Sequence, residues 1–225
     1  MNVSFAFFII LFVMHVNNKN LPKKILSWYD NNKRSLPWRI SKKSKKIHYF
    51  RVLSEFMLQQ TQVRTVIPYF NNFTKKIPNL KTLSRSNEKT VLRLWEGLGY
   101  YRRAKNLHRT SKILIKKYKG RIPNSFMELK ELPGIGDYTA NVLLALIYNQ
   151  PRVAFDGNVK RVLSRLLNTN IDTKFTSNLF KTKRNGDFAE ALMEFGALIC
   201  KPQDPKCYEC KIKEMCKYYT SESKI

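Results

Sequence analysis

Four cysteines lie within seventeen residues near the C-terminus of this chain, as Cys200, Cys207, Cys210 and Cys216, and the chain has no other cysteine. Their spacing is C-x6-C-x2-C-x5-C. Thiolate ligands of a metal converge from short loops that tolerate irregular geometry, so four thiols gathered in this way predict one metal centre. The C-terminal part of the fold therefore has to wrap a loop around that centre.

Three chemistries can use such a group of thiols. Two disulfides suit a secreted domain, but they usually join distant segments, and a loop this short gains little from a second cross-link. Structural zinc usually shows two C-x2-C pairs, whereas Cys207 and Cys210 form the one pair present here. A cubane iron-sulfur cluster needs one cysteine per iron. We therefore expect a 4Fe-4S cluster in a reducing compartment, with zinc and disulfides as open alternatives.

The charge of the chain is strongly positive. Its 225 residues, enough for one large or two small helical domains, include 42 Lys and Arg against 16 Asp and Glu, a formal net charge of +26. Such an excess predicts a polyanionic partner. Part of it can equally reflect translation from an AT-rich genome, because lysine, asparagine and isoleucine are abundant throughout. The lysine-rich stretch 41–46 fits a solvated loop or a phosphate contact.

The first 20 residues form an apolar N-terminal extension. The apolar run 3–16 is too short to span a bilayer comfortably. It also lacks the basic start and the small-residue cleavage site of a secretory signal. We expect an upstream extension or a misassigned start rather than a membrane anchor, and no stable association with membranes.

The remaining pattern is that of an all-α protein. From residue 21 onward apolar residues recur at helical spacing, no strand-like alternation persists, and Pro or Gly separates the helical runs at Pro68, Pro78, Gly97, Gly120, Pro133 and Pro151. Helices are expected at about 21–32, 48–67, 88–96, 102–118, 125–131, 137–149, 157–168 and 187–199.

A glycine-rich turn, LPGIG at 132–136, separates a short helix from an amphipathic one. Gly134 and Gly136 permit a tight turn with exposed amides just before a helix N-terminus. Such a turn makes an anion nest suited to a DNA phosphate, which an enzyme can hold without reading sequence. The alternative is a loop between helices that only packs.

Two acidic residues are candidates for chemistry. Glu55 lies beside the apolar stripe of its helix, where partial desolvation would raise its pKa and let it donate a proton. The alternative is a solvated helix glutamate. Asp156 precedes the helix that carries Lys160 and Arg161, and N-capping alone would explain it. The paired Gln59 and Gln60 offer donors and acceptors for base edges.

The chain from about residue 25 to 218 resembles the catalytic domain of the MutY-type adenine DNA glycosylases, in the helix-hairpin-helix DNA glycosylase superfamily. LPGIG, the downstream Asp156 and the cysteine loop are shared with endonuclease III-type enzymes. The segments closer to the MutY-type pattern are LPWR (36–39), SEFMLQQTQV (54–63), GLGYYRRAKNLH (97–108) and FDGNVKRVL (155–163).

The resemblance implies a fold and its domains. The expected helix-hairpin-helix glycosylase fold joins a six-helix-type barrel domain to an iron-sulfur cluster domain, with the DNA cleft between them. The catalytic domain would span 21–218, with the barrel at about 49–150, the hairpin at 132–150, the cluster domain at 21–48 and 151–218, and a tail at 219–225. MutY-type enzymes usually add a C-terminal domain, similar to Nudix hydrolases, that reads 8-oxoguanine. This chain ends at Ile225, so we expect that domain to be absent.

The resemblance also assigns roles at the reacting sugar. Glu55 would protonate adenine and help activate water, and Asp156 would stabilise the sugar cation or a transient covalent intermediate. Tyr138 and Asn158 would orient the site. Bifunctional endonuclease III-type enzymes carry a Schiff-base lysine where this chain has Tyr138, so a monofunctional enzyme is implied.

Further residues are implied to contact DNA. Gln60 and Tyr100 would fill the space that the extruded base leaves, because the target must first leave the helix. Trp38, Arg34 and Arg39 would line the adenine pocket. The remaining implied contacts come from Gly134, Gly136 and Lys160, and from Lys201, Lys206 and Lys211 in the cluster loop.

The expected function is thus adenine removal in base excision repair. The substrate would be double-stranded DNA with adenine opposite 8-oxoguanine or guanine, bound by a monomer in the bacterial cytoplasm at the nucleoid. One alternative is an endonuclease III-like or thymine-mismatch glycosylase. Another is an inactive iron-sulfur protein that only binds DNA.

Overall fold

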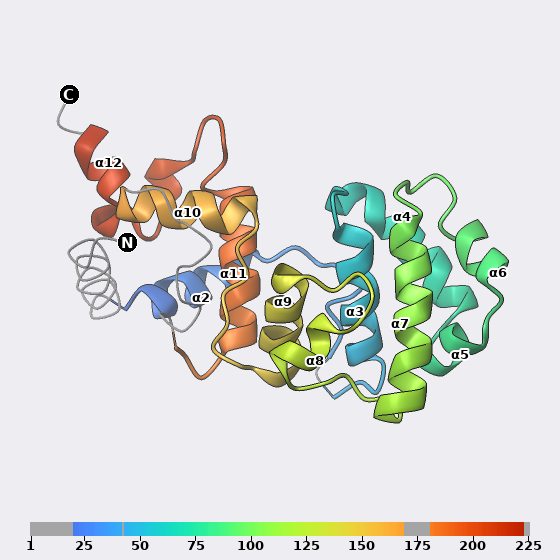
Figure 1. Cartoon of the computed structure of the whole chain (residues 1–225). Coiled ribbons are helices and arrows are strands. Elements are labelled where there is room, and N and C mark those ends of the chain that lie inside the picture. The colour runs from blue at the N-terminus through green and yellow to red at the C-terminus, as the bar shows by residue number, and fades with distance from the viewer. Residues whose placement is uncertain (1–19, 42, 169–180, 223–225) are drawn as a thin grey trace. The chain divides into compact units, whose positions relative to one another are not determined.

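The computed structural model describes residues 20–41, 43–168 and 181–222, and all regular elements in these ranges are helices (Figure 1). The prediction of an all-α fold is confirmed. No described helix is both long and apolar enough to cross a membrane. The apolar run 3–16 lies outside the described residues.

The α-helices are α2 (Leu21–Asn32), α3 (Ile47–Leu58), α4 (Val63–Lys76), α5 (Leu80–Arg85), α6 (Glu88–Arg93), α7 (Arg102–Tyr118), α8 (Phe126–Lys130), α9 (Asp137–Tyr148), α10 (Gly157–Leu167), α11 (Asn185–Leu198) and α12 (Lys217–Glu222), with short 3-10 turns η1 (Cys207–Glu209) and η2 (Lys213–Met215).

The chain divides into two compact units. Among the described residues, the first unit contains those up to Arg34 and those from Tyr148 onward, and the second contains those from Ser35 to Ile147. The domain bounds expected from the sequence stay predictions.

The core of the first unit forms where α2, α10 and α11 pack together (Figure 1). Helix α10 buries Val159, Val162, Leu163, Leu166 and Leu167, whose spacing places them on one face. Trp28 of α2 meets Phe195 of α11 edge to face, with ring centroids 4.9 Å apart. These three packed helices support the segment that carries Asp156.

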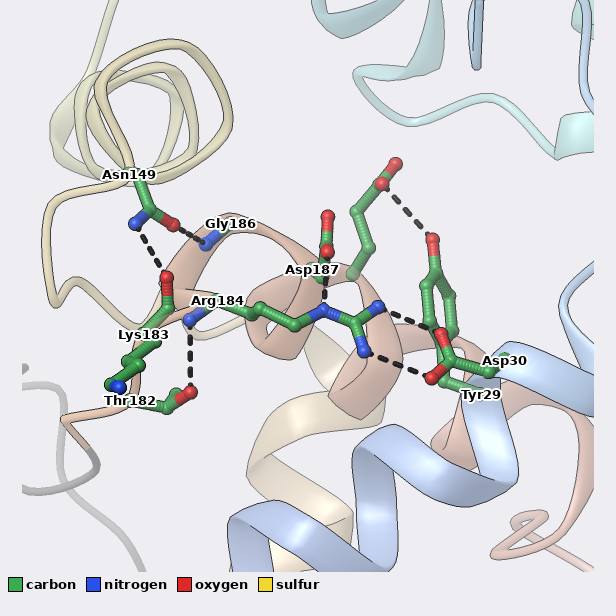
Figure 2. Close-up of polar contacts among 9 residues, drawn as sticks. Tyr29, Asp30, Asn149, Thr182, Lys183, Arg184, Gly186 and Asp187 are labelled. Atoms are coloured by element: carbon green, nitrogen blue, oxygen red, sulfur yellow. Dashed lines mark hydrogen bonds and ion pairs between the residues drawn. The ribbon is translucent and has the colours of Figure 1, made fainter. Parts of the chain in front are cut away.

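A polar network fixes the start of α11 against α2 (Figure 2). Arg184 donates from Nη1 and Nη2 to the Asp30 carboxylate at 2.9 and 2.7 Å and from Nε to Asp187 at 2.8 Å. On the other side Asn149 donates to the Lys183 carbonyl and accepts from the Gly186 amide. The Arg184 guanidinium holds the pKa of the Asp30 carboxyl below its usual value. The bond to the Gly186 amide satisfies one of the backbone donors that the start of a helix leaves open.

The second unit contains α3 to α8 and most of α9. Its core includes the fully buried rings of Phe56, Phe70, Phe73 and Trp95. Tyr49 donates from its hydroxyl to the Ile77 carbonyl at 2.7 Å, and burial raises the pKa of this phenol. Helix α3 is buried along most of its length, which places Glu55 inside this unit.

The expectation of one helix over 48–67 is wrong. Helix α3 ends at Leu58, and α4 begins at Val63 and continues through Pro68. The break comes where Gln60 adopts a left-handed backbone with φ +57°, which cannot continue a right-handed helix. Pro68 therefore does not separate two helices, and the short α5, whose N-cap Asn79 accepts from the Thr82 amide, was not expected.

Candidate active site

The glycine turn joins α8 to α9. Gly134 has φ +81°, and a Cβ there would lie 2.9 Å from atoms of Asn106 and Phe56, so both the backbone and the packing require glycine. Its carbonyl accepts from Gln59 Nε2 at 3.1 Å. Gly136 is exposed and faces open space, while Ile135 between them is 5% exposed. The turn thus anchors one side chain in the core and leaves backbone at the surface before α9.

Glu55 is buried on α3, at 9% exposure. The alternative of a solvated helix glutamate is therefore wrong. The two neighbouring side chains, Ser54 and Phe56, are completely buried. Tyr138 lies half-buried in the first turn of α9, in the same unit. A carboxyl held this far from water is suited to exchange a proton with a ligand rather than with solvent.

Asp156 is the N-cap of α10, as the sequence predicted. Its Oδ1 accepts from the Val159 amide at 2.7 Å, and its Oδ2 accepts from Asn158 Nδ2 at 3.2 Å. Both carboxyl oxygens are thus engaged, which fixes the orientation of this side chain at the start of α10. The geometry therefore presents an oriented, half-buried carboxyl group in the first unit.

Arg161, one turn further along α10, supports this arrangement. Its Nη2 donates to Asn158 Oδ1 at 2.7 Å and to the Gly196 carbonyl at 2.8 Å, and its Nε donates to the Cys200 carbonyl at 2.7 Å. A Cβ on Gly196 would lie 2.6 Å from the Cβ of Asn158, so glycine lets α11 approach closely. The sequence identified Arg161 as a basic residue only. Its i+3 spacing from Asn158 was the available signal.

Three residues expected at the adenine pocket have structural partners. Arg34 donates from Nη2 to Oε1 of Glu194 at 2.6 Å, and Glu194 is 2% exposed. Trp38 is 3% exposed and meets Phe70 edge to face at 5.3 Å. Arg39 is half-buried, and its amide donates to the Leu36 carbonyl. Their contact with adenine stays a prediction.

Two residues expected to enter the duplex are exposed and share an unusual backbone. Gln60 has φ +57°, and Tyr100 has φ +48° and is 61% exposed. Both are in the second unit. Lys160 is half-exposed on α10. In the lysine-rich stretch 41–46, Lys43, Lys45 and Lys46 are exposed, as expected of a solvated loop.

All four cysteines line one cavity in the first unit, together with Arg165 and Tyr218. Arg165 Nη1 lies 3.5 Å from Cys200 Sγ and also donates to the Lys201 carbonyl. Burial, together with smaller contributions from the other three cysteines, raises the pKa of the Cys210 thiol to about 12. Four thiols that share one cavity need a cationic centre to ionise together, so this donor set fits an iron-sulfur cluster or another thiophilic metal.

The described residues contain no group of three or more His, Cys, Asp or Glu side chains already arranged around a single metal ion. Of the lysines in the cysteine loop, Lys206 pairs with Glu209 at 3.1 Å. Lys211 is exposed and Lys201 is half-exposed. The loop therefore presents positive charge near the thiols.

A family model described as "HhH-GPD superfamily base excision DNA repair protein" matches residues 53–183. Among curated proteins, the "Adenine DNA glycosylase" of Buchnera aphidicola (strain Bp) is 46% identical over 87% of this chain and 57% of its own length. The mouse protein of the same name is 38% identical over 87% of this chain and 41% of its own length. The chain thus spans about half the length of these relatives.

Solved structures show the same fold at lower identity. A thermostable thymine-DNA glycosylase has a TM-score of 0.81 and is 24% identical, covering 92% of this chain and 99% of its own. A non-covalent endonuclease III-DNA complex has a TM-score of 0.72 at 18% identity, covering 93% and 98%. These structures establish the helical architecture.

Proposed function

The chain belongs to the HhH-GPD superfamily of base excision DNA repair proteins, and on that premise we propose that it is an adenine DNA glycosylase. The observation that carries the proposal is the 46% identity to a curated adenine DNA glycosylase over 87% of the chain. The segment 53–183, which the family model matches, includes both candidate carboxyl residues, Glu55 and Asp156, and the hairpin.

The proposed substrate is double-stranded DNA with adenine opposite 8-oxoguanine or guanine, bound by a monomer in the bacterial cytoplasm. The positive charge of +26 favours a polyanion, and the exposed backbone at Gly134 and Gly136 before α9 suits a phosphate. The target nucleotide would leave the stack before reaction, and Gln60 and Tyr100 would occupy the space.

Hydrolysis of the N-glycosidic bond needs a proton for the departing base and a negative charge near the oxocarbenium-like sugar. Glu55 is suited to the first role because it is buried and its proton would pass to adenine rather than to water. Asp156 is suited to the second role because the Val159 amide and the Asn158 side chain hold its two carboxyl oxygens in a fixed orientation. Tyr138 and Asn158 would orient the site.

The absence of a Schiff-base lysine at Tyr138 supports a monofunctional enzyme, which releases adenine and leaves the strand intact. Cys200, Cys207, Cys210 and Cys216 would hold a 4Fe-4S cluster. When bound, the cluster would supply a rigid four-point link across the loop and take no part in cleaving the glycosidic bond. Lys201 and Lys211 would then lie where they can contact the DNA backbone.

The test is release of free base from defined duplexes that carry adenine opposite G, C, T or 8-oxoguanine, with a G:T duplex added. We expect adenine from the 8-oxoguanine and G duplexes, alkali-sensitive sites at the same positions, and no adduct trapped by borohydride. Glu55→Gln is the control, since it should bind DNA and release no base. Release of thymine without adenine, or no release by protein with full iron and sulfide content, would contradict the proposal.

A further inference from the structure

Arg103 connects two segments of the second unit that are far apart in sequence. Its guanidinium is buried at the start of α7, with the residue 6% exposed. Nη1 donates to the carbonyls of Phe56, Met57 and Gln59, at 3.3, 2.7 and 2.6 Å. Nη2 donates to the carbonyls of Leu98 and Gly99, at 3.2 and 3.0 Å. One planar side chain thus holds the end of α3 and the loop before α7.

Each of these two segments leads directly into an exposed residue. The Gln59 carbonyl belongs to the peptide that joins Gln60, and the Gly99 carbonyl belongs to the peptide that joins Tyr100. Both residues have a left-handed backbone, with φ +57° and +48°. A non-glycine residue stays in that region when its surroundings determine the backbone. Arg103 provides such a determinant for both residues at once.

The ring of Tyr100 is held by the same side chain. The Arg103 Cζ lies 5.4 Å from the centre of the Tyr100 ring and 5.5 Å from that of Trp95. Trp95 is fully buried and donates from its indole nitrogen to the Gly99 carbonyl at 3.1 Å. Stacking on a guanidinium fixes the direction of an aromatic ring that would otherwise rotate freely in water.

The partners of Arg103 within the described residues are carbonyl oxygens and two aromatic rings. Burial lowers the pKa of its guanidinium because water is excluded from the charged form. A buried charge matched by neutral carbonyls loses hydration without gaining an ion pair, so it adds little to stability. Its Nη1 and Nη2 donors do specify geometry, because the guanidinium is a rigid planar fork, whereas Nε is buried without a hydrogen-bond partner.

We propose that Arg103 is a positioning residue that holds Gln60 and Tyr100 at a fixed separation, so that the two side chains enter the duplex together when the target base leaves it. The inference rests on the proposed function, since it requires a duplex with an extruded base. Lysine at this position keeps the charge but is a point donor with three hydrogens, and it cannot bridge both segments.

The test measures base extrusion separately from bond cleavage. In a Glu55→Gln background, 2-aminopurine replaces the target adenine opposite 8-oxoguanine, and its fluorescence rises on unstacking. We expect Arg103→Lys to lower the extruded fraction by about 10- to 100-fold, the effect of misplacing an interacting group by about 1 Å. Arg109→Lys is the matched control, because Arg109 is exposed on the same helix. If Arg103→Lys and Arg109→Lys extrude the same fraction of the target base, the proposal is overturned.

A second protein background, in which Gln60 and Tyr100 are both replaced by alanine, distinguishes the positioning role of Arg103 from a purely structural one. If Arg103 acts through Gln60 and Tyr100, then Arg103→Lys has no further effect on extrusion once both are alanine. Equal losses in both backgrounds would show that Arg103 only stabilises the unit and would overturn the positioning role. If Arg103→Lys does not fold, Arg103→Gln, which is neutral and keeps donors, is used in both backgrounds with the same expectations.

Hydrogen exchange of the free protein gives a readout that is independent of activity. We expect the amides of 59–61 and 98–101 to exchange faster in Arg103→Lys than in Arg109→Lys, while the rest of α7 is unchanged. A wild-type protein that releases no adenine contradicts the proposed function alone. Unchanged exchange in Arg103→Lys overturns the positioning role even in that case.

Discussion

Arg161 donates from Nη2 to Oδ1 of Asn158 over 2.7 Å, and Asn158 in turn donates to Oδ2 of Asp156. The same guanidinium donates to the backbone carbonyl of Cys200, the first cysteine of the C-terminal loop. Two side chains therefore connect the carboxylate that would face the sugar to the segment that would hold the cluster. The backbone at Cys200 thus has a route to Asp156 through Arg161 and Asn158, and this route does not involve the cysteine thiol.

Arg161→Lys is expected to slow adenine release by about 10- to 100-fold in single turnover, because Asn158 and hence Asp156 lose their fixed orientation. Affinity for the duplex should change little, since the guanidinium is occupied by protein acceptors. Arg85→Lys, an exposed arginine on α5, is the control for the substitution itself. Equal rates for the two variants would rule out this route to Asp156.

Asp156 has a capping role and a proposed chemical role, which two substitutions separate. Asparagine retains a side-chain oxygen for the Val159 amide, so Asp156→Asn should keep nearly full stability and lose adenine release. Asp156→Ala should lose release and also about 1 kcal/mol of unfolding free energy. Urea unfolding and single-turnover release measure the two effects. Undiminished release by Asp156→Asn would remove the carboxylate from the mechanism.

Gly196 and Gly157 form a matched pair for packing around Asn158. Gly196→Ala places a Cβ 2.6 Å from the Asn158 Cβ and 3.0 Å from its backbone, so α11 and α10 must separate. We expect a loss of about 1–3 kcal/mol in unfolding free energy. A Cβ on Gly157 meets nothing within 4 Å, and Gly157→Ala should be close to neutral. Similar thermal midpoints for the two variants would contradict this account.

Because His108 is buried, we expect the free energy of unfolding to fall in mild acid. This residue of α7 is 1% exposed, and burial lowers the pKa of its imidazole from 6.5. The charge of Lys112 also lowers this pKa, whereas Glu88, whose Oε2 lies 3.9 Å from Nδ1 of His108, opposes the shift. As pH falls through 6.5, the unfolded chain binds a proton that the folded chain resists, so unfolding becomes easier.

The measurement is the urea midpoint of wild type and His108→Leu at pH 7.5 and 5.5. Wild type should lose more unfolding free energy than the variant over this interval, and one histidine can contribute at most about 1.4 kcal/mol per pH unit. Parallel acid loss in both proteins would assign the effect to other groups.

Cys200→Ser, or removal of the metal by a chelator, is expected to weaken folding and DNA binding before it affects the carboxylate chemistry. The buried thiols then lose the cationic centre that lets them ionise together, and the loop bearing Lys201 and Lys211 loses its shape. Binding titrations at several salt concentrations and iron and sulfide analysis check this. Full salt-dependent affinity in cluster-free protein would disprove it.

Helices with a continuous amphipathic pattern were predictable because the pattern is local. The helices predicted at 21–32 and 102–118 begin and end at the same residues as α2 and α7. The boundary between α3 and α4 was not predictable in this way. It lies at Gln60, whose neighbouring carbonyl is held by Arg103 from 44 residues away.

The sequence by itself determined the helical class, the group of four thiols and the superfamily, because these depend on residue types and short spacings along the chain. The tertiary structure decided which charged groups are engaged. Arg34 pairs with the buried Glu194, and Arg161 joins Asn158 to the Cys200 backbone. Such partners depend on remote backbone and side-chain groups that meet only when the helices have packed, so no local pattern encodes them.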